Sequence, residues 1–453
     1  MKHPDNKHNG KAIKGRLPWL IALVILSLFL CSCSSQQGNT PTPQPPNMTH
    51  QPAITPGPQD TVTPEVSPVP TPKEESLEEK VEKLMNTLTL EEKIGQLFFI
   101  ASRYDGTGSP QLSMDEDLEL ILKQYKPGGF IFFAENLQSI DQTVAFTEGL
   151  QAASKIPMFI GIDEEGGIVT RLNKAPQLHA TVMPSPYDIG KTHQPVYAYE
   201  VAHAISEEIK SLGFNLNFAP VADIFNNPQN KVIGKRAYAS EPDLASRMVE
   251  QAVKGALDCG IVPVLKHFPG HGNTSQDSHT GAAVVERTLE QLKASEWLPF
   301  KAGMDAGAKM VMTAHVLTPG VTDNNLPATL SKPILDYLRK DLGFDGVIIT
   351  DGLEMNAISA FFPEDEAVVL AIQAGVDMLL LPNDLPRAYT AILNAIHDGR
   401  LTEERIDASV ERILMLKYEW LIDVPDHDLD PEKTLGSEEH RALADKIRKE
   451  STP

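Results

Sequence analysis

Short apolar runs alternate with longer amphipathic segments over most of the chain. The runs are rich in Ile, Val, Leu and Phe, and at about 4 to 8 residues they have the length of buried strands. They lie at residues 97–101, 128–133, 157–163, 215–220, 262–268, 309–315, 346–351 and 378–382. Helical periodicity is found between them, for example at residues 197–212, 241–258, 331–342 and 363–375.

Eight strands that are each followed by a helix predict an α/β fold, namely a (β/α)8 barrel of the TIM type. We assign residues 76–422 to this single catalytic domain, which begins with helices at residues 76–88 and after Thr89. A doubly wound open sheet has a similar alternation and is the alternative. The segment EEGG at residues 164–167 lacks the GxGxxG spacing, which argues against a phosphate-binding loop there.

The first 33 residues have the pattern of an export signal. Basic residues precede an apolar run at residues 17–30 that is too short to span a bilayer comfortably. The run ends in LCSC, where Cys33 after a small residue resembles the lipidated cysteine of a bacterial lipobox. We therefore expect an exported protein that is lipid-anchored to the outer face of the bacterial cell membrane. An ordinary signal peptide or an uncleaved anchor is the alternative.

Two further segments flank the predicted domain. Residues 34–75 form a Pro/Thr/Ser-rich linker, with eleven prolines between Pro41 and Pro72. Because such a segment cannot bury apolar surface, we expect it to be an extended tether. Residues 423–453 form a C-terminal extension. The formal net charge of −21 argues against nucleic acid as a partner.

Ionisable residues recur at the carboxyl ends of the predicted strands, where the active sites of barrels lie. These residues are Asp163, Asp223, Lys266, His267, His315 and Asp351. Arg171 and Arg236 follow in the polar segments IDEEGGIVTR and VIGKRAY. Several donors and acceptors without a phosphate-binding loop suit a neutral, hydroxyl-rich ligand. His315 has an alternative interpretation, as a hydrogen-bonded histidine at a strand end.

The segment KHFPGHGNTSQDSH, residues 266–279, permits two kinds of chemistry. His267 and His271 are four apart, as in helical metal sites, but the proline and glycines make a helix unlikely. A zinc site wrapped by the loop is the alternative. Asp277 and His279 project to the same side of an extended segment and can hydrogen-bond. A histidine oriented by a carboxylate can protonate a leaving group and afterwards deprotonate water, which we favour.

Asp351 follows a buried run in ITDGLEM, at the end of a predicted strand. A carboxylate at this position can attack the anomeric carbon of a sugar and form a covalent glycosyl-enzyme intermediate. The alternative is that Asp351 is the N-cap of the next helix.

These residues occur in motifs that resemble glycoside hydrolase family 3, in its bacterial β-N-acetylglucosaminidase (β-hexosaminidase) branch. The matching segments are IDEEGG, VTRL, NFAPVADI, VIGKRAYAS, KHFPGHGNTSQDSH, PATLS, LGFDGVIITDGLEM and AGVDMLLLP. They run in the family's order over residues 80–420, and the loop KHFPGHGxTxxDSH is the most specific of them. The chain departs from the usual motifs at Ile168, Lys231, Ala237, Asn273 and Gly352. Ile168 and the altered loop with Lys231 and Ala237 bear on substrate preference more than on activity.

The resemblance implies a role for each candidate residue. Asp351 would be the nucleophile, and His279, paired with Asp277, would be the acid/base. The residues that would bind the terminal N-acetylglucosamine are Asp163, Arg171, Arg236, Lys266 and His267. The C-terminal extension resembles the link to a second domain in longer relatives, which this form lacks.

The resulting expectation is a retaining exo-β-N-acetylglucosaminidase that removes terminal GlcNAc from β-linked glycans, most plausibly the GlcNAc–MurNAc fragments of peptidoglycan. We expect a monomer whose partners are its carbohydrate substrate and the membrane, with no metal and no cofactor. A phosphorylase that uses phosphate in place of water is one alternative, and a non-catalytic wall-binding lipoprotein is another.

Overall fold

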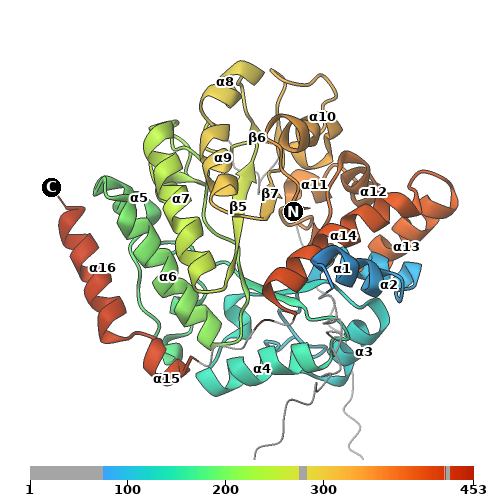
Figure 1. Cartoon of the computed structure of the whole chain (residues 1–453), viewed down its shortest axis with the longest axis horizontal. Coiled ribbons are helices and arrows are strands. Elements are labelled where there is room, and N and C mark those ends of the chain that lie inside the picture. Colours follow the sequence, from blue (N-terminus) through green and yellow to red (C-terminus); the bar gives the residue numbers. More distant parts are fainter. Residues whose placement is uncertain (1–74, 275–282, 423, 425–428, 453) are drawn as a thin grey trace, which may run out of the picture. The chain divides into compact units, whose positions relative to one another are not determined.

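Eight parallel strands form the sheet at the centre of the chain (Figure 1). The computed structural model describes residues 75–274, 283–422, 424 and 429–452. The strands are β1 (Phe98–Ile100), β2 (Gly129–Phe132), β3 (Phe159–Ile162), β4 (Leu216–Asn217), β5 (Val262–Phe268), β7 (Met310–Thr313), β9 (Val347–Ile349) and β10 (Leu379–Leu380). Their order is β10-β1-β2-β3-β4-β5-β7-β9, and each of the eight lies within one of the predicted apolar runs.

The two end strands of this sheet meet and nearly close it into a barrel. Ile349 at the end of β9 forms a parallel bridge with Met378, directly before β10. The backbone N–H of Thr350 also donates to the carbonyl of Met378 at 3.0 Å. The predicted (β/α)8 barrel is therefore confirmed, and the open-sheet alternative is wrong.

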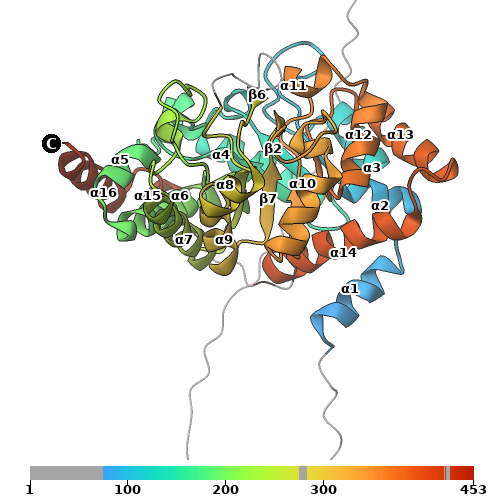
Figure 2. The same cartoon turned by 90° about the horizontal axis from the view of Figure 1, so that it is seen from above.

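Helices cover the outside of the barrel between successive strands (Figures 1 and 2). They are α2 (Leu90–Gln96), α3 (Glu116–Tyr125), α4 (Ile140–Ala152), α6 (Pro195–Ser211), α7 (Pro242–Asp258), α9 (Trp297–Asp305), α10 (Lys332–Asp336), α12 (Glu364–Ala374), α13 (Leu385–His397) and α14 (Glu403–Trp420). The predicted helix at residues 331–342 is α10 continued by a π-helical turn at Tyr337–Asp341.

Capping residues account for the first two helices. Ser76 begins α1 (Leu77–Met85) and Thr89 begins α2, and each accepts a hydrogen bond from the backbone of a glutamate three residues later. Both glutamates, Glu79 and Glu92, reach back to the backbone N–H of their cap, which completes a capping box. Helix α1 packs against α14, as Figure 2 shows.

Aromatic side chains fill the barrel beneath its carboxyl-terminal face. The rings of Phe99 and Phe218 meet edge to face, with centroids 5.2 Å apart. A Cβ atom on Gly129 would lie 2.5 Å from the ring of Phe99, so this strand position has room only for glycine. Phe218 also forms part of the floor of the cavity described below, so the packed core supports the site directly.

The described part of the C-terminal extension contains two helices. Helices α15 (Pro431–Thr434) and α16 (Glu438–Glu450) pack on the outside of the barrel against α6, and α16 also contacts α5 (Pro186–Lys191). The predictions for the signal segment with Cys33 and for almost all of the linker concern residues 1–74, outside the described part. No helix among the described residues is both long and apolar enough to cross a membrane.

Candidate active site

A cavity of about 380 Å3 opens at the carboxyl ends of the barrel strands. Six of the predicted site residues line it, namely Asp163, Arg171, Arg236, Lys266, His267 and Asp351. They come from positions as far apart as β3 and β9, and the barrel brings them together because parallel strands end on the same face. Its floor is apolar and includes Ile131, Phe218 and Met312.

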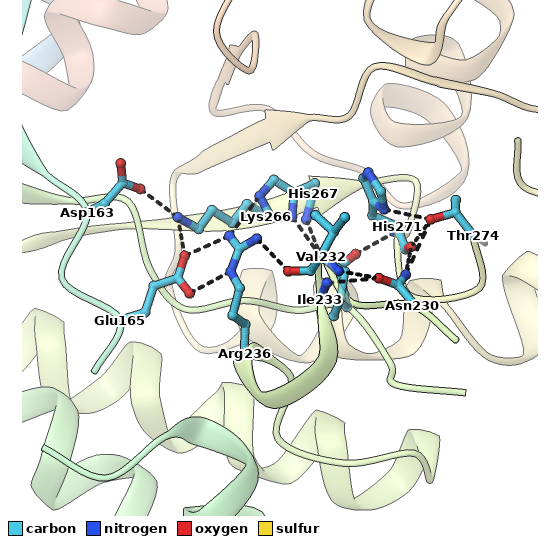
Figure 3. A network of polar contacts seen from close by, with 11 residues as sticks. Asp163, Glu165, Asn230, Val232, Ile233, Arg236, Lys266, His267, His271 and Thr274 are labelled. Carbon is cyan, nitrogen blue, oxygen red and sulfur yellow. Dashed lines mark hydrogen bonds and ion pairs between the residues drawn. The ribbon is translucent and has the colours of Figure 1, made fainter. Parts of the chain in front are cut away.

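Lys266 is the centre of a buried ion-pair network on one wall (Figure 3). Its Nζ lies 2.7 Å from Oδ1 of Asp163 and 2.6 Å from Oε1 of Glu165, and its side chain is only 2% exposed. Arg171 donates to the other oxygen of Asp163 at 3.0 Å. Arg236 makes a bidentate contact with Glu165, at 2.9 Å from Nε and 2.8 Å from Nη2. The two carboxylates thus pair with three cations on this wall.

The network keeps both carboxylates ionised. Burial by itself would raise the pKa of Asp163, but the charges of Lys266 and Arg171 lower it well below its usual value. Burial is likewise outweighed at Glu165, whose pKa is lowered by Arg236 and Lys266. Asp163 therefore presents a permanent acceptor to the cavity, and the cations beside it present donors. Such a wall suits the hydroxyl groups of a sugar.

His267 is held in one tautomer by Asp223. Its Nδ1 lies 2.8 Å from Oδ2 of Asp223, and its Nε2 lies 3.4 Å from Nη2 of Arg236. Because an arginine can only donate, Nε2 must accept in this contact and Nδ1 must carry the proton. Burial opposes ionisation of Asp223, but His267 lowers the pKa of this carboxyl, through its charge when the ring is protonated and through the hydrogen bond from Nδ1. The aspartate therefore sets which nitrogen of His267 faces the cavity.

Asp351 lies two residues beyond β9 and faces the same cavity. Its Oδ1 accepts the backbone N–H of Gly352 at 2.8 Å. Burial would raise the pKa of Asp351, but the nearby rings of His267 and His315, when they are protonated, lower it. The next helix, α11 (Asn356–Ser359), has Met355 as its N-cap, so the N-cap alternative for Asp351 is wrong.

Comparison with known proteins identifies the family. Residues 89–416 match the family described as "Glycosyl hydrolase family 3 N terminal domain". The chain belongs to glycosyl hydrolase family 3. The resemblance in the motifs is thereby confirmed at the level of the family.

Two named relatives are similar over most of this chain. Beta-hexosaminidase A of Pseudoalteromonas piscicida is 35% identical over 397 residues, which are 79% of this chain and 65% of that protein. Beta-hexosaminidase LpqI of Mycobacterium tuberculosis is 32% identical over 312 residues, 66% of this chain and 78% of that one. This chain thus spans 65% of the length of its relative from P. piscicida.

A solved family 3 structure is also similar. The glycoside hydrolase family 3 beta-N-acetylglucosaminidase from Paenibacillus sp. str. FPU-7 superposes with a TM-score of 0.75 and 39% sequence identity. The match covers 81% of this chain and 69% of that chain.

From the sequence, no catalytic or binding role was assigned to Glu165 and Asp223, two carboxylates of this family 3 site. Glu165 is the counter-ion of Arg236 and Lys266, and Asp223 orients His267. The charge balance could have predicted such residues, since buried cations at strand ends require buried anions as counter-ions. The sequence contains several acidic residues near these positions, so that signal does not select among them.

His315 is bonded on both ring nitrogens. Nδ1 lies 2.8 Å from Oγ1 of Thr329, and Nε2 lies 2.9 Å from the carbonyl oxygen of Gly352. The interpretation as a hydrogen-bonded strand-end histidine is therefore confirmed. Through Gly352, His315 also supports the backbone directly after Asp351.

The turn at residues 270–274 leads from β5 toward the predicted acid/base. The backbone N–H of His271 donates to Oδ1 of Asp223 at 2.6 Å, and its carbonyl accepts from Asn230 at 2.8 Å. A Cβ atom on Gly272 would lie 1.8 Å from the carbonyl oxygen of Ile224, so this glycine is required by close backbone packing. Asp277 and His279 themselves lie outside the described residues.

The zinc alternative involved the same segment. The ring centroids of His267 and His271 are 6.1 Å apart. Within the part of the chain that the structure describes, no three His, Cys, Asp or Glu side chains are grouped so that they could hold a metal ion. The remaining members of that alternative, Asp277 and His279, are not in this part.

Proposed function

We propose that this chain is a retaining exo-β-N-acetylglucosaminidase. The observation that carries the proposal is the ionised Asp351, two residues beyond β9, in a cavity that is also lined by Asp163 and the cations paired with it. The names of its relatives, Beta-hexosaminidase and beta-N-acetylglucosaminidase, support the same activity.

In the proposed mechanism Asp351 is the nucleophile. Its lowered pKa keeps it ionised in the neutral range, so it can attack the anomeric carbon without a base to deprotonate it. Asp163, Arg171, Arg236, Lys266 and His267 would bind the hydroxyl and acetamido groups of the terminal GlcNAc. The sugar would then be held with its anomeric carbon toward Asp351, which lowers the entropic part of the barrier.

His279 is the proposed acid/base, oriented by Asp277. It would protonate the glycosidic oxygen while Asp351 attacks, and would then deprotonate the water that hydrolyses the glycosyl-enzyme. The sequence position of His279 supports this role, because the turn at residues 270–274, which follows the end of β5 at the cavity, precedes His279 by only a few residues. A neutral histidine repels phosphate less than a second carboxylate would, which keeps phosphorolysis as the rival reaction.

The proposed substrates are the GlcNAc–MurNAc fragments of peptidoglycan. The export signal, the cysteine at position 33 and the proline-rich linker support an enzyme that is attached outside the cell membrane by a lipid. Such an enzyme would act on glycans within reach of its tether.

A chromogenic β-GlcNAc substrate tests the activity and the roles together. We expect wild type to release the chromophore, and Asp351→Asn to lose activity by about 10³-fold or more. Asp345→Asn is the matched control, since this aspartate precedes the same strand but its side chain is 84% exposed. His279→Ala should lose least on substrates whose leaving groups need no protonation.

Three results would contradict the proposal in different ways. Full activity of Asp351→Asn would reject the nucleophile. A product yield that depends on added phosphate would favour the phosphorylase. Binding of GlcNAc oligomers by a wild type that releases nothing would favour a non-catalytic wall-binding protein.

A further inference from the structure

Two consecutive carboxylates hold Arg171 in different ways. Asp163 accepts a hydrogen bond from its side chain, with 3.0 Å between Oδ2 and Nη2. Oε2 of Glu164, the next residue, accepts the backbone N–H of Arg171 at 2.8 Å and that of Leu172 at 3.0 Å. Among the described residues, those that line the active-site cavity include Asp163 and Arg171 but not Glu164, which is 4% exposed. Glu164 therefore acts on the cavity through its neighbours.

The backbone of Glu164 is fixed by the neighbouring strand. Its N–H donates to Oδ1 of Asn217 at 3.0 Å, and its carbonyl oxygen accepts from Nδ2 of the same side chain at 2.9 Å. Asn217 is the last residue of β4 and is buried. The backbone N–H of Glu165 donates to the carbonyl of Val169 at 2.9 Å, which ties the two sides of the loop together. A support that is itself held in this way keeps a binding residue in one position.

Glu164 differs from Glu165 in the way its charge is stabilised. Burial raises the pKa of Glu164 to about 7, although hydrogen bonds from the hydroxyl of Thr170 and from the two backbone N–H groups act in the opposite direction. In the described part of the chain no lysine or arginine forms an ion pair with Glu164, whereas Glu165 pairs with Arg236 and Lys266. Glu165 therefore stays ionised, and Glu164 gains or loses its charge near neutral pH.

Other titratable groups around Glu164 come from several elements. Glu208 on α6 is a nearby carboxylate whose charge opposes the ionisation of Glu164. Oε1 of Glu208 in turn lies 3.0 Å from Nδ1 of His440 on α16. Glu165 and Tyr238 line the same cavity as Glu164, one of about 30 Å3, and burial raises the pKa of Tyr238 far above the neutral range. Of these neighbours, His440 is the one that also titrates near neutral pH.

We propose that Glu164 is a positioning residue of the active site, whose ionised carboxylate holds Arg171 against Asp163. When Glu164 is protonated, one of its oxygens becomes a donor, and the hydrogen bonds from the backbone are no longer strengthened by a charge. Arg171 is then held less firmly beside the sugar. The positioning role rests on the proposed function, because it makes the activity of that same site depend on pH.

The expected signature is an acid limb in the pH profile of kcat/KM. This parameter covers the steps up to the glycosyl-enzyme, for which Asp351 must be ionised and His279 protonated. The lowered pKa of Asp351 places its own limb far below neutral pH, and His279 gives a limb on the alkaline side. We expect kcat/KM to fall about 3- to 10-fold as the pH drops through about 7, the effect of weakening two charge-assisted hydrogen bonds.

Two variants test whether Glu164 is the source of this limb. Glu164→Gln keeps the shape but cannot ionise, so its kcat/KM should lie about 3- to 10-fold below wild type above neutral pH and should lack the limb. Thr170→Val removes a donor to the carboxylate, so it should raise the pKa of Glu164 and move the limb to higher pH. Glu250→Gln, which breaks the pair with Lys254 on α7, and His440→Gln are controls that should keep the limb.

A chromogenic β-GlcNAc, quenched at alkaline pH, gives kcat/KM from about pH 5 to about pH 9, and thermal unfolding checks the fold of each variant. The positioning role would be overturned, with the hydrolase intact, by a wild type without the limb or by a Glu164→Gln enzyme that keeps it. A limb that does not move in Thr170→Val, or an equal loss at every pH in Glu164→Gln, would also overturn it. A wild type that releases no chromophore at any pH would overturn the proposed function and the positioning role together.

Discussion

Asp223 gives the sharpest test of the electrostatics in this site. Its carboxylate is 1% exposed and accepts three N–H groups, from Nδ1 of His267 at 2.8 Å, the backbone of His267 at 3.3 Å and the backbone of His271 at 2.6 Å. The change Asp223→Asn keeps the shape but replaces one acceptor oxygen with a donor. One of these three N–H groups then faces the new amide N–H of the asparagine instead of an acceptor.

The easiest relief is a change of tautomer at His267. If Nδ1 loses its proton to accept from the new amide, Nε2 gains one and points it at Arg236, 3.4 Å away. Hydrogen bonds to a charged group contribute about 1.5–3 kcal/mol each. The loss of about 3 kcal/mol in the transition-state complex corresponds to roughly 100-fold in kcat/KM, at about 1.4 kcal/mol per factor of ten.

Steady-state kinetics on a chromogenic β-GlcNAc measure this loss, and thermal unfolding measures the effect on the fold. The control is Asp336→Asn on α10, which removes a carboxylate bonded to Lys332, with its side chain 33% exposed. We expect the control to stay within about twofold of wild type, as surface pairs contribute little. An Asp223→Asn enzyme that also stayed within about threefold would refute the claim that this aspartate sets the tautomer of His267.

Three further predictions concern the fold. Gly272→Ala should lower the melting temperature and the activity, because its Cβ would meet the carbonyl oxygen of Ile224 at 1.8 Å; an unchanged melting temperature would contradict this. His440 is buried between Glu207 and Glu208. Burial opposes its protonation, but hydrogen bonds and charge from these carboxylates raise its pKa. The stability that protonated His440 contributes is therefore present below about pH 6.5 and is lost as the pH rises. Thermal unfolding of His440→Gln should show the deficit only at the acidic end, while His397→Gln, at a side chain 88% exposed, shows none at any pH. Burial lowers the pKa of Lys417 to about 7, so wild type should gain stability from about pH 7 to 10, and Lys417→Met should lack this gain in denaturant titrations.

The barrel was predictable because its evidence is local. Each strand is a short apolar run, and each run is separated from the next by a segment with helical periodicity. Capping residues such as Thr89 also act within one turn of the helix they begin. The ends of the strands were less predictable. The run at residues 215–220 was expected to be a strand throughout, but only Leu216–Asn217 pair as β4, since ladder hydrogen bonds depend on the neighbouring strands.

The cavity residues were predictable for a related reason. In a barrel of parallel strands every carboxyl end faces the same side, so ionisable residues that follow apolar runs must share one face. Asp163, Lys266 and Asp351 could be placed together on this basis, and the cavity contains all three.

The partners of these residues depended on the tertiary structure. Lys266 pairs with Asp163, 103 positions earlier in the chain, and His267 with Asp223, 44 positions earlier. No local pattern selects Glu165 rather than Glu164 as the counter-ion of Arg236, because the choice follows from which side chain points into the wall. Glu164 is buried elsewhere, where burial raises its pKa to about 7 and the backbone N–H groups of Arg171 and Leu172 bind it.

The glycines of KHFPGHGNTSQDSH show both what the local sequence predicts and what only the tertiary structure decides. Their lack of a side chain excludes a stable helix, which is a property of the residues alone. Why Gly272 must be glycine is visible only where the turn meets the carbonyl of Ile224 from the preceding strand's loop. Local sequence is thus sufficient for elements and for the face on which side chains emerge. Charge pairing and close backbone contacts arise between distant segments, so only the folded chain specifies them.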